Sequence, residues 1–298
     1  DIRLGSMLRN HIEGIPLDLA ARLLPRRTRL SFGLGPHIHL HARAQRKHAG
    51  DGGSPADAKA KSVRSMSASK LATLIESLRT TVEGLTWEPE GTAWVDYAEN
   101  TSYDDEATAA KAAAVKEALV AAAGTRAWDL GANTGRYSQI AARAGYTVVA
   151  LDIDPGAVER GYLGLRQQGR TDILPLLADL TDPGPALGWG SAERRALLDR
   201  IDSDAVLALA LVHHLAIGAN VPLPMIAALF ARLAPHVIVE FVPKSDAMVK
   251  RLLASRIDIF DDYHVGGFRA AFDQHFDLVS ETPIVGSERT LYHFRRPT

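Results

Sequence analysis

The chain has 298 residues, 46% of them hydrophobic, with a formal net charge of −1 and no cysteine. Such a chain can bury one large hydrophobic core or two modest ones. The lack of cysteine excludes disulfides, thiolate zinc sites, iron–sulfur clusters and a cysteine nucleophile, and it is typical of a cytoplasmic protein. No apolar run approaches the ~18 to 20 residues of a membrane span, and no segment has the order of a signal peptide, so we expect no membrane partner.

Positive charge is concentrated in the N-terminal part of the chain. Residues 1–66 contain twelve Lys and Arg against five Asp and Glu, a net charge of +7, which leaves −8 for the remainder. Such a bias is typical of a solvated face or of a contact with the protein's own acidic domain; nucleic acid is the alternative partner, which we do not favour. Because the sequence begins at Asp1 rather than Met, we expect a processed product or a fragment of a longer protein.

Residues 1–48 predict a basic N-terminal extension that mixes a short helical pattern with a stretch punctuated by Pro and Gly. His37, His39 and His41 alternate, which predicts one face of a strand. No carboxylate is nearby, so we favour a plain strand face over a metal site. Residues 49–67 are mainly Gly, Ser, Ala, Asp, Lys and Pro, a composition that predicts a flexible linker.

Two helices are predicted next. Residues 71–85 carry Leu, Ile and Val at spacings of three, four and seven, which predicts a packed amphipathic helix. An alanine-rich helix is predicted from about 106 to 123 and is closed by Gly124. The stretch between them is rich in aromatic residues, Tyr103 among them, which either roof a pocket or plug the end of a core; their position directly before the next strand favours the pocket.

A glycine-containing turn follows that strand. Residues 128–135 read Trp-Asp-Leu-Gly-Ala-Asn-Thr-Gly, and a chain that leaves a buried strand and turns under a ligand needs residues that tolerate positive φ. Gly131 and Gly135 meet this need, and Asn133 is the next most permissive type. The following helix, roughly residues 136–144, directs its unpaired N–H groups into the same crevice.

A second acid, Asp152, ends the next apolar strand. A carboxylate at this position can accept both ribose hydroxyls of a nucleoside, whereas Asp129, two residues before Gly131, favours a cationic amino-acid group. The dinucleotide pattern G-x-G-x-x-G is not matched, because Asn133 and Arg136 stand where its second and third glycines would lie. The two acids therefore predict a site for S-adenosylmethionine rather than for NAD or FAD.

Strands and helices continue to alternate after Asp152, which is typical of a parallel sheet with covering helices. The predicted strands are residues 173–178, 205–212, 236–242, 276–279 and 290–294. Pro175 places the first of these at a sheet edge, because proline cannot donate to a strand ladder. The next two are continuous apolar runs, as buried central strands should be, and the last two predict a terminal antiparallel pair.

With these residues placed, the chain from about Trp87 onward resembles the class I S-adenosylmethionine-dependent methyltransferases on residues 128–135. Within this class, residues 206–215 and 239–244 resemble those of the group related to a nodulation protein. The resemblance implies an α/β fold: a Rossmann-like sheet of seven mostly parallel strands with helices on both faces, the last strand antiparallel. The extension at the N-terminus lies outside it.

The resemblance also implies site residues. Asp129 and Gly131 would line the methionine end, Asp152 would hold the ribose, and Asp179 would meet the adenine amine with Leu180 against the ring. The candidate cofactor-binding residues are Tyr103, Asp129, Gly131, Ala132, Asn133, Gly135, Asp152, Ile153, Asp179 and Leu180. We expect this methyltransferase domain over residues 68–298, with a helical cap over 68–125 and the Rossmann-like core over 126–298.

Methyl transfer to a hydroxyl or a protonated amine needs a base beside the acceptor. His213 and His214 stand at the predicted end of the fourth strand; neighbours in an extended segment face opposite sides, so we predict that His213 alone reaches the substrate. Glu240 is a competing base or substrate ligand, since a lone carboxylate in an apolar strand must find a partner or stay protonated. Residues 211–214 lack the Asn/Asp-Pro-Pro-Tyr signature of exocyclic-amine methylation.

The sequence thus predicts a methyltransferase that acts on oxygen of a small-molecule or carbohydrate-linked acceptor by in-line transfer, and the acceptor class rests on the resemblance alone. Two alternatives stay open. One is an RNA or protein methyltransferase that uses the basic N-terminal segment for recognition. The other is a non-catalytic domain that binds S-adenosylmethionine for regulation.

Overall fold

The computed structural model describes residues 5–48, 67–88, 105–254 and 256–297. It divides the chain into two compact units, Asp1–Glu88 and Pro89–Thr298. The methyltransferase domain that we predict over residues 68–298 begins earlier than the second unit. The helix predicted over residues 71–85 lies in the first unit. The linker predicted over residues 49–67 lies outside the described residues except at its last position.

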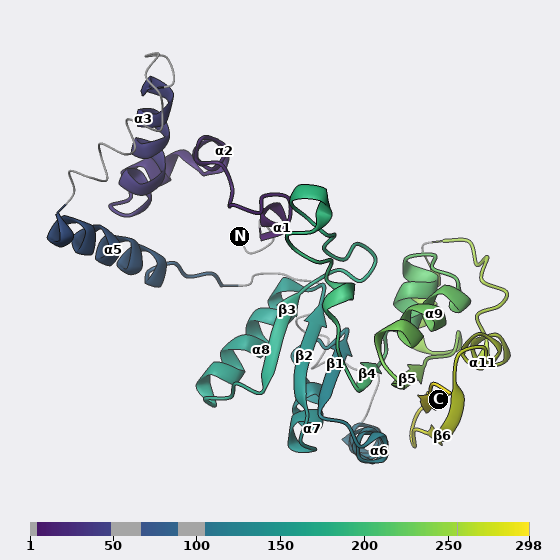
Figure 1. The fold of residues 1–298 in the computed structure, drawn as a ribbon. Helices are drawn as coiled ribbons and strands as arrows, with labels where there is room; N and C mark the ends of the chain where they lie inside the picture. The colour runs from purple at the N-terminus through teal and green to yellow at the C-terminus, as the bar shows by residue number, and fades with distance from the viewer. Residues whose placement is uncertain (1–4, 49–66, 89–104, 255, 298) are drawn as a thin grey trace. The chain divides into compact units, whose positions relative to one another are not determined.

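The first unit is built from helices. Among its described residues the elements are α1 (Gly5–Leu8), α2 (Leu17–Leu23), the 3-10 helix η2 (Arg26–Leu30), the π-helical segment η3 (Gly35–Leu40), α3 (His41–His48) and α5 (Ala68–Glu83) (Figure 1). The strand predicted for His37, His39 and His41 is wrong, because all three residues are helical. Pro36 stands in the first turn of η3, where proline favours a helix start, and this signal prevails over the short alternation of histidines.

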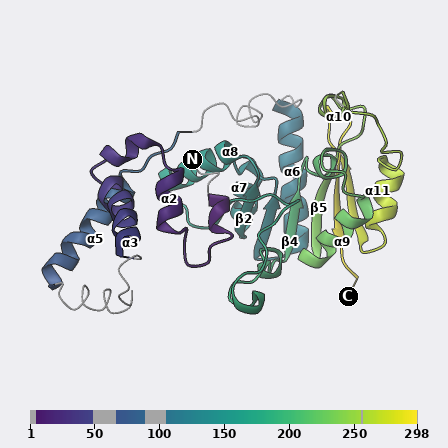
Figure 2. The ribbon, with the colours of Figure 1, turned by 90° about the horizontal axis from the view of Figure 1, so that it is seen from above.

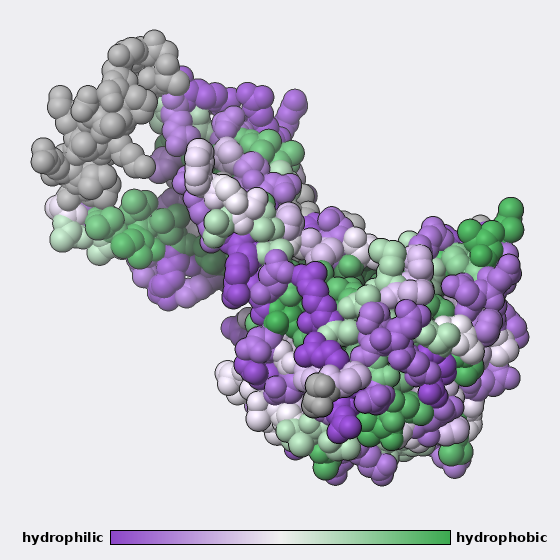
Figure 3. All heavy atoms as spheres, turned by 45° about the vertical axis from the view of Figure 1, so that its right-hand side comes forward, coloured by the Kyte–Doolittle hydropathy of each residue, from purple (hydrophilic) through white to green (hydrophobic). Residues whose placement is uncertain are grey.

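The amphipathic pattern after residue 67 does form a helix, α5. Ser67 caps it, since its Oγ accepts a hydrogen bond from the Lys70 N–H at 3.3 Å. The apolar face is not packed as the pattern predicts: the side chains of Leu71, Ile75 and Val82 are about half exposed or more. Figure 3 shows green, hydrophobic surface along α5. The periodicity therefore identifies the helix but not a core for it.

The second unit contains a seven-stranded sheet. Its strands are β1 (Arg126–Leu130), β2 (Thr147–Asp152), β3 (Ile173–Leu177), β4 (Ala205–Ala208), β5 (His236–Phe241), β6 (Asp277–Pro283) and β7 (Thr290–Arg295). The strands lie in the order β3-β2-β1-β4-β5-β7-β6 (Figures 1 and 2). β1 to β5 are parallel, and β7 is antiparallel to both of its neighbours. The predicted seven-stranded, mostly parallel sheet and its terminal antiparallel pair are confirmed.

The strand order creates a crevice at the centre of the sheet. The chain runs outward from β1 through β2 to β3 and then returns to place β4 on the other side of β1, so the topology switches between β1 and β4. Ligands of open α/β sheets bind at the carboxyl ends of the strands at such a point. β3 lies at the edge of the sheet, which is the position that the missing N–H of Pro175 requires. Pro175 is aligned there with Ala150 of β2.

Helices cover both faces of the sheet. They are α6 (Asp105–Ala122), α7 (Arg136–Arg143), α8 (Pro155–Gln167), α9 (Leu223–Leu233), α10 (Ala247–Leu253) and α11 (Val265–Phe272), with the short segments η5 (Trp189–Ser191), η6 (Leu198–Arg200) and η7 (His214–Gly218). Successive β1 residues face opposite cores: Ala127 belongs to the cluster that contains α6 and α7, and Trp128 to the cluster that contains α9 and α11. None of the helices in the described ranges has the length and apolar character that a membrane crossing needs.

Candidate cofactor and acceptor site

The turn after β1 adopts the left-handed geometry that its residue types predict. Gly131, Asn133 and Gly135 have φ angles of 74°, 51° and 85°. The N–H groups of Gly131 and Ala132 both donate to the carbonyl oxygen of Leu151 at 2.9 Å, which fixes the start of the turn to β2. A Cβ at position 131 would lie 3.2 Å from Leu211 Cδ1, so a larger residue would require a small shift of the Leu211 side chain in addition to the left-handed φ.

Asp152 ties the same turn to the end of β2. Its Oδ2 accepts a hydrogen bond from the Asn133 N–H at 2.7 Å, and its Oδ1 accepts one from the Asp154 N–H at 2.7 Å. Burial raises the pKa of this carboxyl, and the backbone donors oppose that shift. An ionised carboxylate offers about four acceptor positions. Asp152 therefore keeps acceptor capacity for a ligand after both backbone bonds are made.

Asp129 is the last residue but one of β1, directly before the turn, and is 2% exposed. Its Oδ2 accepts a hydrogen bond from Ser138 Oγ at 2.6 Å, a contact that anchors α7 to β1. Burial raises the pKa of Asp129 to about 6, because few dipoles replace the lost water. A cationic group that entered beside it would stabilise the ionised form, so the site favours a positively charged ligand group.

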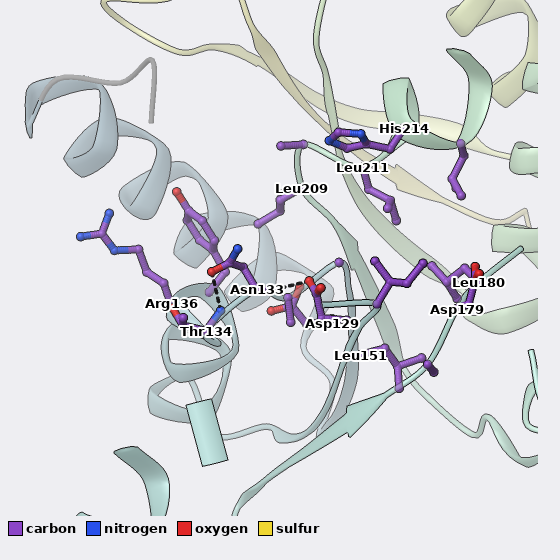
Figure 4. A pocket seen from close by; sticks show the side chains of 18 of the residues that line it. Asp129, Asn133, Thr134, Arg136, Leu151, Asp179, Leu180, Leu209, Leu211 and His214 are labelled. Atoms are coloured by element: carbon purple, nitrogen blue, oxygen red, sulfur yellow. Dashed lines mark hydrogen bonds between the residues drawn. The ribbon is translucent and has the colours of Figure 1, made fainter. Parts of the chain in front are cut away.

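A cavity of about 630 Å³ opens above these strand ends. In Figure 4 the labelled side chains surround it: Asn133 from the turn, Arg136 from the start of α7, Asp179 and Leu180 from the segment after β3, and His214 from the segment after β4. A volume of this size is typical of a small-molecule site rather than of a surface groove for a large partner.

Eight of the ten candidate cofactor residues line this cavity. They are Asp129, Gly131, Ala132, Asn133, Asp152, Ile153, Asp179 and Leu180. Gly135 is not a wall residue; its N–H closes the turn by donating to the Ala132 carbonyl oxygen at 2.9 Å. Tyr103 lies outside the described residues. The sequence motifs thus bring together residues from three successive strand ends.

The segment after β4 is not extended as predicted. β4 ends at Ala208, and Ala210 has a φ of 50°, after which His213 is helical and His214 begins η7. The assumption that the two histidines face opposite sides of a strand is therefore wrong. His214 lines the cavity, whereas His213 is fully buried and does not. Within the described part of the chain, neither ring nitrogen of His213 has a hydrogen-bond partner.

The pKa of His214 is lowered to about 4 by burial and by the charge of Arg289. The imidazole is consequently uncharged at neutral pH and has a nitrogen lone pair that can accept a proton. Its ring centroid lies 4.1 Å from that of His213, so the buried neighbour packs against the wall residue and limits its movement.

Glu240 is fully buried and is not part of the cavity wall. It has the partner that a carboxylate in an apolar strand requires: Lys111 Nζ donates to its Oε2 at 2.6 Å. Arg289 Nη1 lies 3.7 Å from Glu240 Oε1, and Arg289 Nε donates to Asp246 Oδ2 at 2.7 Å. Burial lowers the pKa of Lys111, and the charge of Glu240 opposes that shift. This four-residue cluster joins α6, β5, the start of α10 and the segment before β7.

Lys111 and Arg289 are wall residues that the sequence analysis missed. Lys111 did carry a signal, because it occupies a buried position of α6, four residues before Val115, where an unpartnered lysine is not tolerated. Its Nζ also lies 4.6 Å from the ring centroid of Tyr137, a third wall residue. Arg289 carried no comparable signal in the sequence.

The chain matches a nodulation protein in sequence. It is 35% identical over 298 residues to nodulation protein NoeA of Rhizobium meliloti (strain 1021), an alignment that covers 99% of this chain. The chain spans 62% of the length of that protein. No family model matches the chain.

Solved structures to which the chain shows some similarity include methyltransferases. The N-methyltransferase NodS from Bradyrhizobium japonicum WM9, in complex with S-adenosyl-L-homocysteine, gives a TM-score of 0.49 at 11% identity over 68% of this chain and 98% of that one. Magnesium protoporphyrin IX methyltransferase (ChlM) from Synechocystis PCC 6803, with bound S-adenosylhomocysteine, gives 0.45 at 16% identity over 64% and 85%. WbdD gives 0.46 at 14% identity over 73% and 46%.

Proposed function

We propose that this protein is an S-adenosylmethionine-dependent methyltransferase. The observation that carries the proposal is the pair of buried carboxylates, Asp129 and Asp152, at the ends of neighbouring parallel strands beneath one cavity. When bound, S-adenosylmethionine supplies an electrophilic methyl group. Asp129 would hold the ammonium of its methionine part, and Asp152 would accept the ribose hydroxyls. The acid after β3, Asp179, would meet the adenine amine.

The same carboxylates argue against a dinucleotide. A pyrophosphate placed over this turn would approach two buried acids, and like charges at short range in a poorly solvated site repel strongly. Arg136 also stands where the dinucleotide pattern needs a small residue for close packing. Ile153 and Leu180 are apolar wall residues from the segments after β2 and β3, and they could pack against the flat adenine ring.

We propose oxygen of a small or carbohydrate-linked molecule as the methyl acceptor. A cavity of about 630 Å³ that also holds the cofactor leaves room for only a compact acceptor group. His214 would accept the hydroxyl proton through an imidazole nitrogen, since it is an uncharged imidazole on the cavity wall. The residues after β4 lack the signature that grips planar amino groups, which favours oxygen over a base amine.

Calorimetry tests the cofactor assignment. Asp152→Ala should abolish measurable binding of S-adenosylhomocysteine while circular dichroism shows the fold retained, because the acid that holds the ribose is gone. Asp261→Ala, at an exposed acid away from the cavity, is the control and should bind as the unmodified protein does. Unchanged affinity in Asp152→Ala would remove the assignment.

Turnover tests the acceptor. S-adenosylhomocysteine production should appear with at least one acceptor from a panel of sugars, glycosides and phenols, and His214→Ala should lower it at least about tenfold with cofactor affinity retained. His213→Leu is the matched variant and should stay active, since His213 does not reach the cavity. Full activity in His214→Ala dismisses this base, and methylation of RNA or protein alone dismisses the small acceptor.

A further inference from the structure

A second hollow, of about 430 Å³, lies within the first unit. Its wall comes from α2, η2, η3 and α3, and four of its residues are arginines: Arg22, Arg29, Arg43 and Arg46. The fifth basic residue on the wall is His39. Figure 3 shows the hydrophilic, purple surface that α3 presents in the upper part of this unit. Arginines from three separate elements therefore converge on one concave surface.

The positive charge of the hollow is not neutralised by described neighbours. All four arginine side chains are exposed, and within the described ranges no acidic side chain forms an ion pair with any of them. The acids of α5, Glu76 and Glu83, are both bound to Arg79 instead. Four like charges around one concavity repel one another and attract anions, and the field is stronger in a hollow than on a flat surface.

The hollow is held open by close packing beneath it. Gly35 is buried, and a Cβ at that position would lie 2.8 Å from the carbonyl oxygen of Arg29, so η2 and η3 approach each other more closely than any other residue permits. Thr28 Oγ1 and His39 Nε2 lie 2.7 Å apart across the same two elements. This packing fixes the backbone from which Arg29 and His39 reach the hollow.

We propose that this hollow binds the phosphate or sulfate monoester of a small molecule. Guanidinium groups match the oxygens of such esters in paired hydrogen bonds, which lysine cannot reproduce. A hollow of about 430 Å³ suits a compact ligand, whereas binding of a nucleic-acid strand needs an extended basic track with aromatic stacking platforms. The site lies in the first unit, and its ligand binding does not depend on the methyltransferase function proposed above.

Calorimetric titration of the full chain with glucose 6-phosphate and with glucose 6-sulfate tests the proposal, and free glucose is the uncharged control. We expect saturable one-to-one binding of at least one ester and none of glucose. The ester that binds more tightly shows whether the hollow prefers a phosphate or a sulfate group. Arg29→Ala/Arg43→Ala should weaken this binding at least about tenfold, because it removes two of the guanidinium groups that would form charge-assisted hydrogen bonds with the anion.

Arg26→Ala/Arg27→Ala is the matched control, since it also removes two positive charges, both from η2, but neither residue belongs to the wall of the hollow. It should bind the ester within about twofold of the unmodified chain. The proposal is overturned if neither ester binds saturably. It is also overturned if both double variants lose the same affinity, because the anion would then be attracted by the overall positive charge and not by a defined site. Binding of single-stranded RNA but of neither ester overturns it as well.

Discussion

Removal of the Lys111 charge should destabilise the second unit more than any exposed substitution on the same helix. Lys111→Met keeps the length and most of the volume of the side chain but leaves Glu240 buried without its 2.6 Å partner. Of the ion pairs described above, those of Glu240 and Asp246 with Arg289 would remain, and the cluster would have lost one positive charge inside the protein. A buried charge without compensation is far more costly than a lost surface pair.

The expected magnitude follows from the geometry. At an effective dielectric constant of about 20, charges 2.6 Å apart attract by about 6 kcal/mol, much of which offsets the cost of removing both groups from water. Breaking such a pair from one side typically costs about 3–5 kcal/mol. For a unit of this size that loss lowers Tm by about 6–20 °C.

Urea unfolding followed by tryptophan fluorescence measures this loss, since Trp128 is buried in the same unit. Lys116→Met, at an exposed position of the same helix, is the control and should change the unfolding free energy by less than about 0.5 kcal/mol. The double variant Lys111→Met/Glu240→Leu removes one charge of each sign and should recover most of the loss. A double variant as unstable as Lys111→Met, or a single variant as stable as the control, would refute the reasoning.

Three further predictions concern protonation and the turn. Asp129 has a pKa of about 6, so affinity for S-adenosylhomocysteine should fall as pH is lowered through 6, when the carboxylate loses its charge; Asp129→Asn should bind weakly with no such pH dependence in calorimetry. His293 has a pKa lowered to about 4 by burial and by His236, against about 6.5 in an unfolded chain. The contribution of the uncharged His293 to the unfolding free energy is therefore complete above pH 6.5 and is lost toward pH 4, by at most about 1.4 kcal/mol per pH unit. His293→Gln should flatten that slope in urea unfolding. Gly131→Ala should lower the unfolding free energy by about 1–2 kcal/mol, because φ is 74° at this position. Gly164→Ala, in open space on α8, should leave the unfolding free energy unchanged or raise it. Equal effects at the two glycines would exclude backbone geometry as the cause.

The turn between β1 and α7 was predictable from the sequence because its requirement is local. Left-handed backbone is decided by residue type, and Gly131, Asn133 and Gly135 all adopt it. The positions of Asp129 and Asp152 follow from the alternation of strands and helices, since parallel strands bring their carboxyl ends to one edge. No long-range contact had to be known for either inference.

Two predictions failed where a short pattern fitted more than one structure. Alternating histidines over residues 37–41 fit a strand, yet this segment is helical. The apolar run 205–212 fits one buried strand, yet the chain leaves the sheet after Ala208 and places His214 rather than His213 on the cavity wall. Periodicity over so few residues does not separate a strand from a buried helix or turn.

The sequence by itself determined the class of fold, the order of most strands along the chain and the acids at two strand ends, because each depends on local residue type and hydrophobic period. Only the tertiary structure decided which distant side chains complete the site. Lys111 and Glu240 are 129 residues apart in sequence, and Arg289 joins them from the segment before β7. A pattern along one element shows which of its residues turn inward, but the partner that each one meets there depends on how the elements pack.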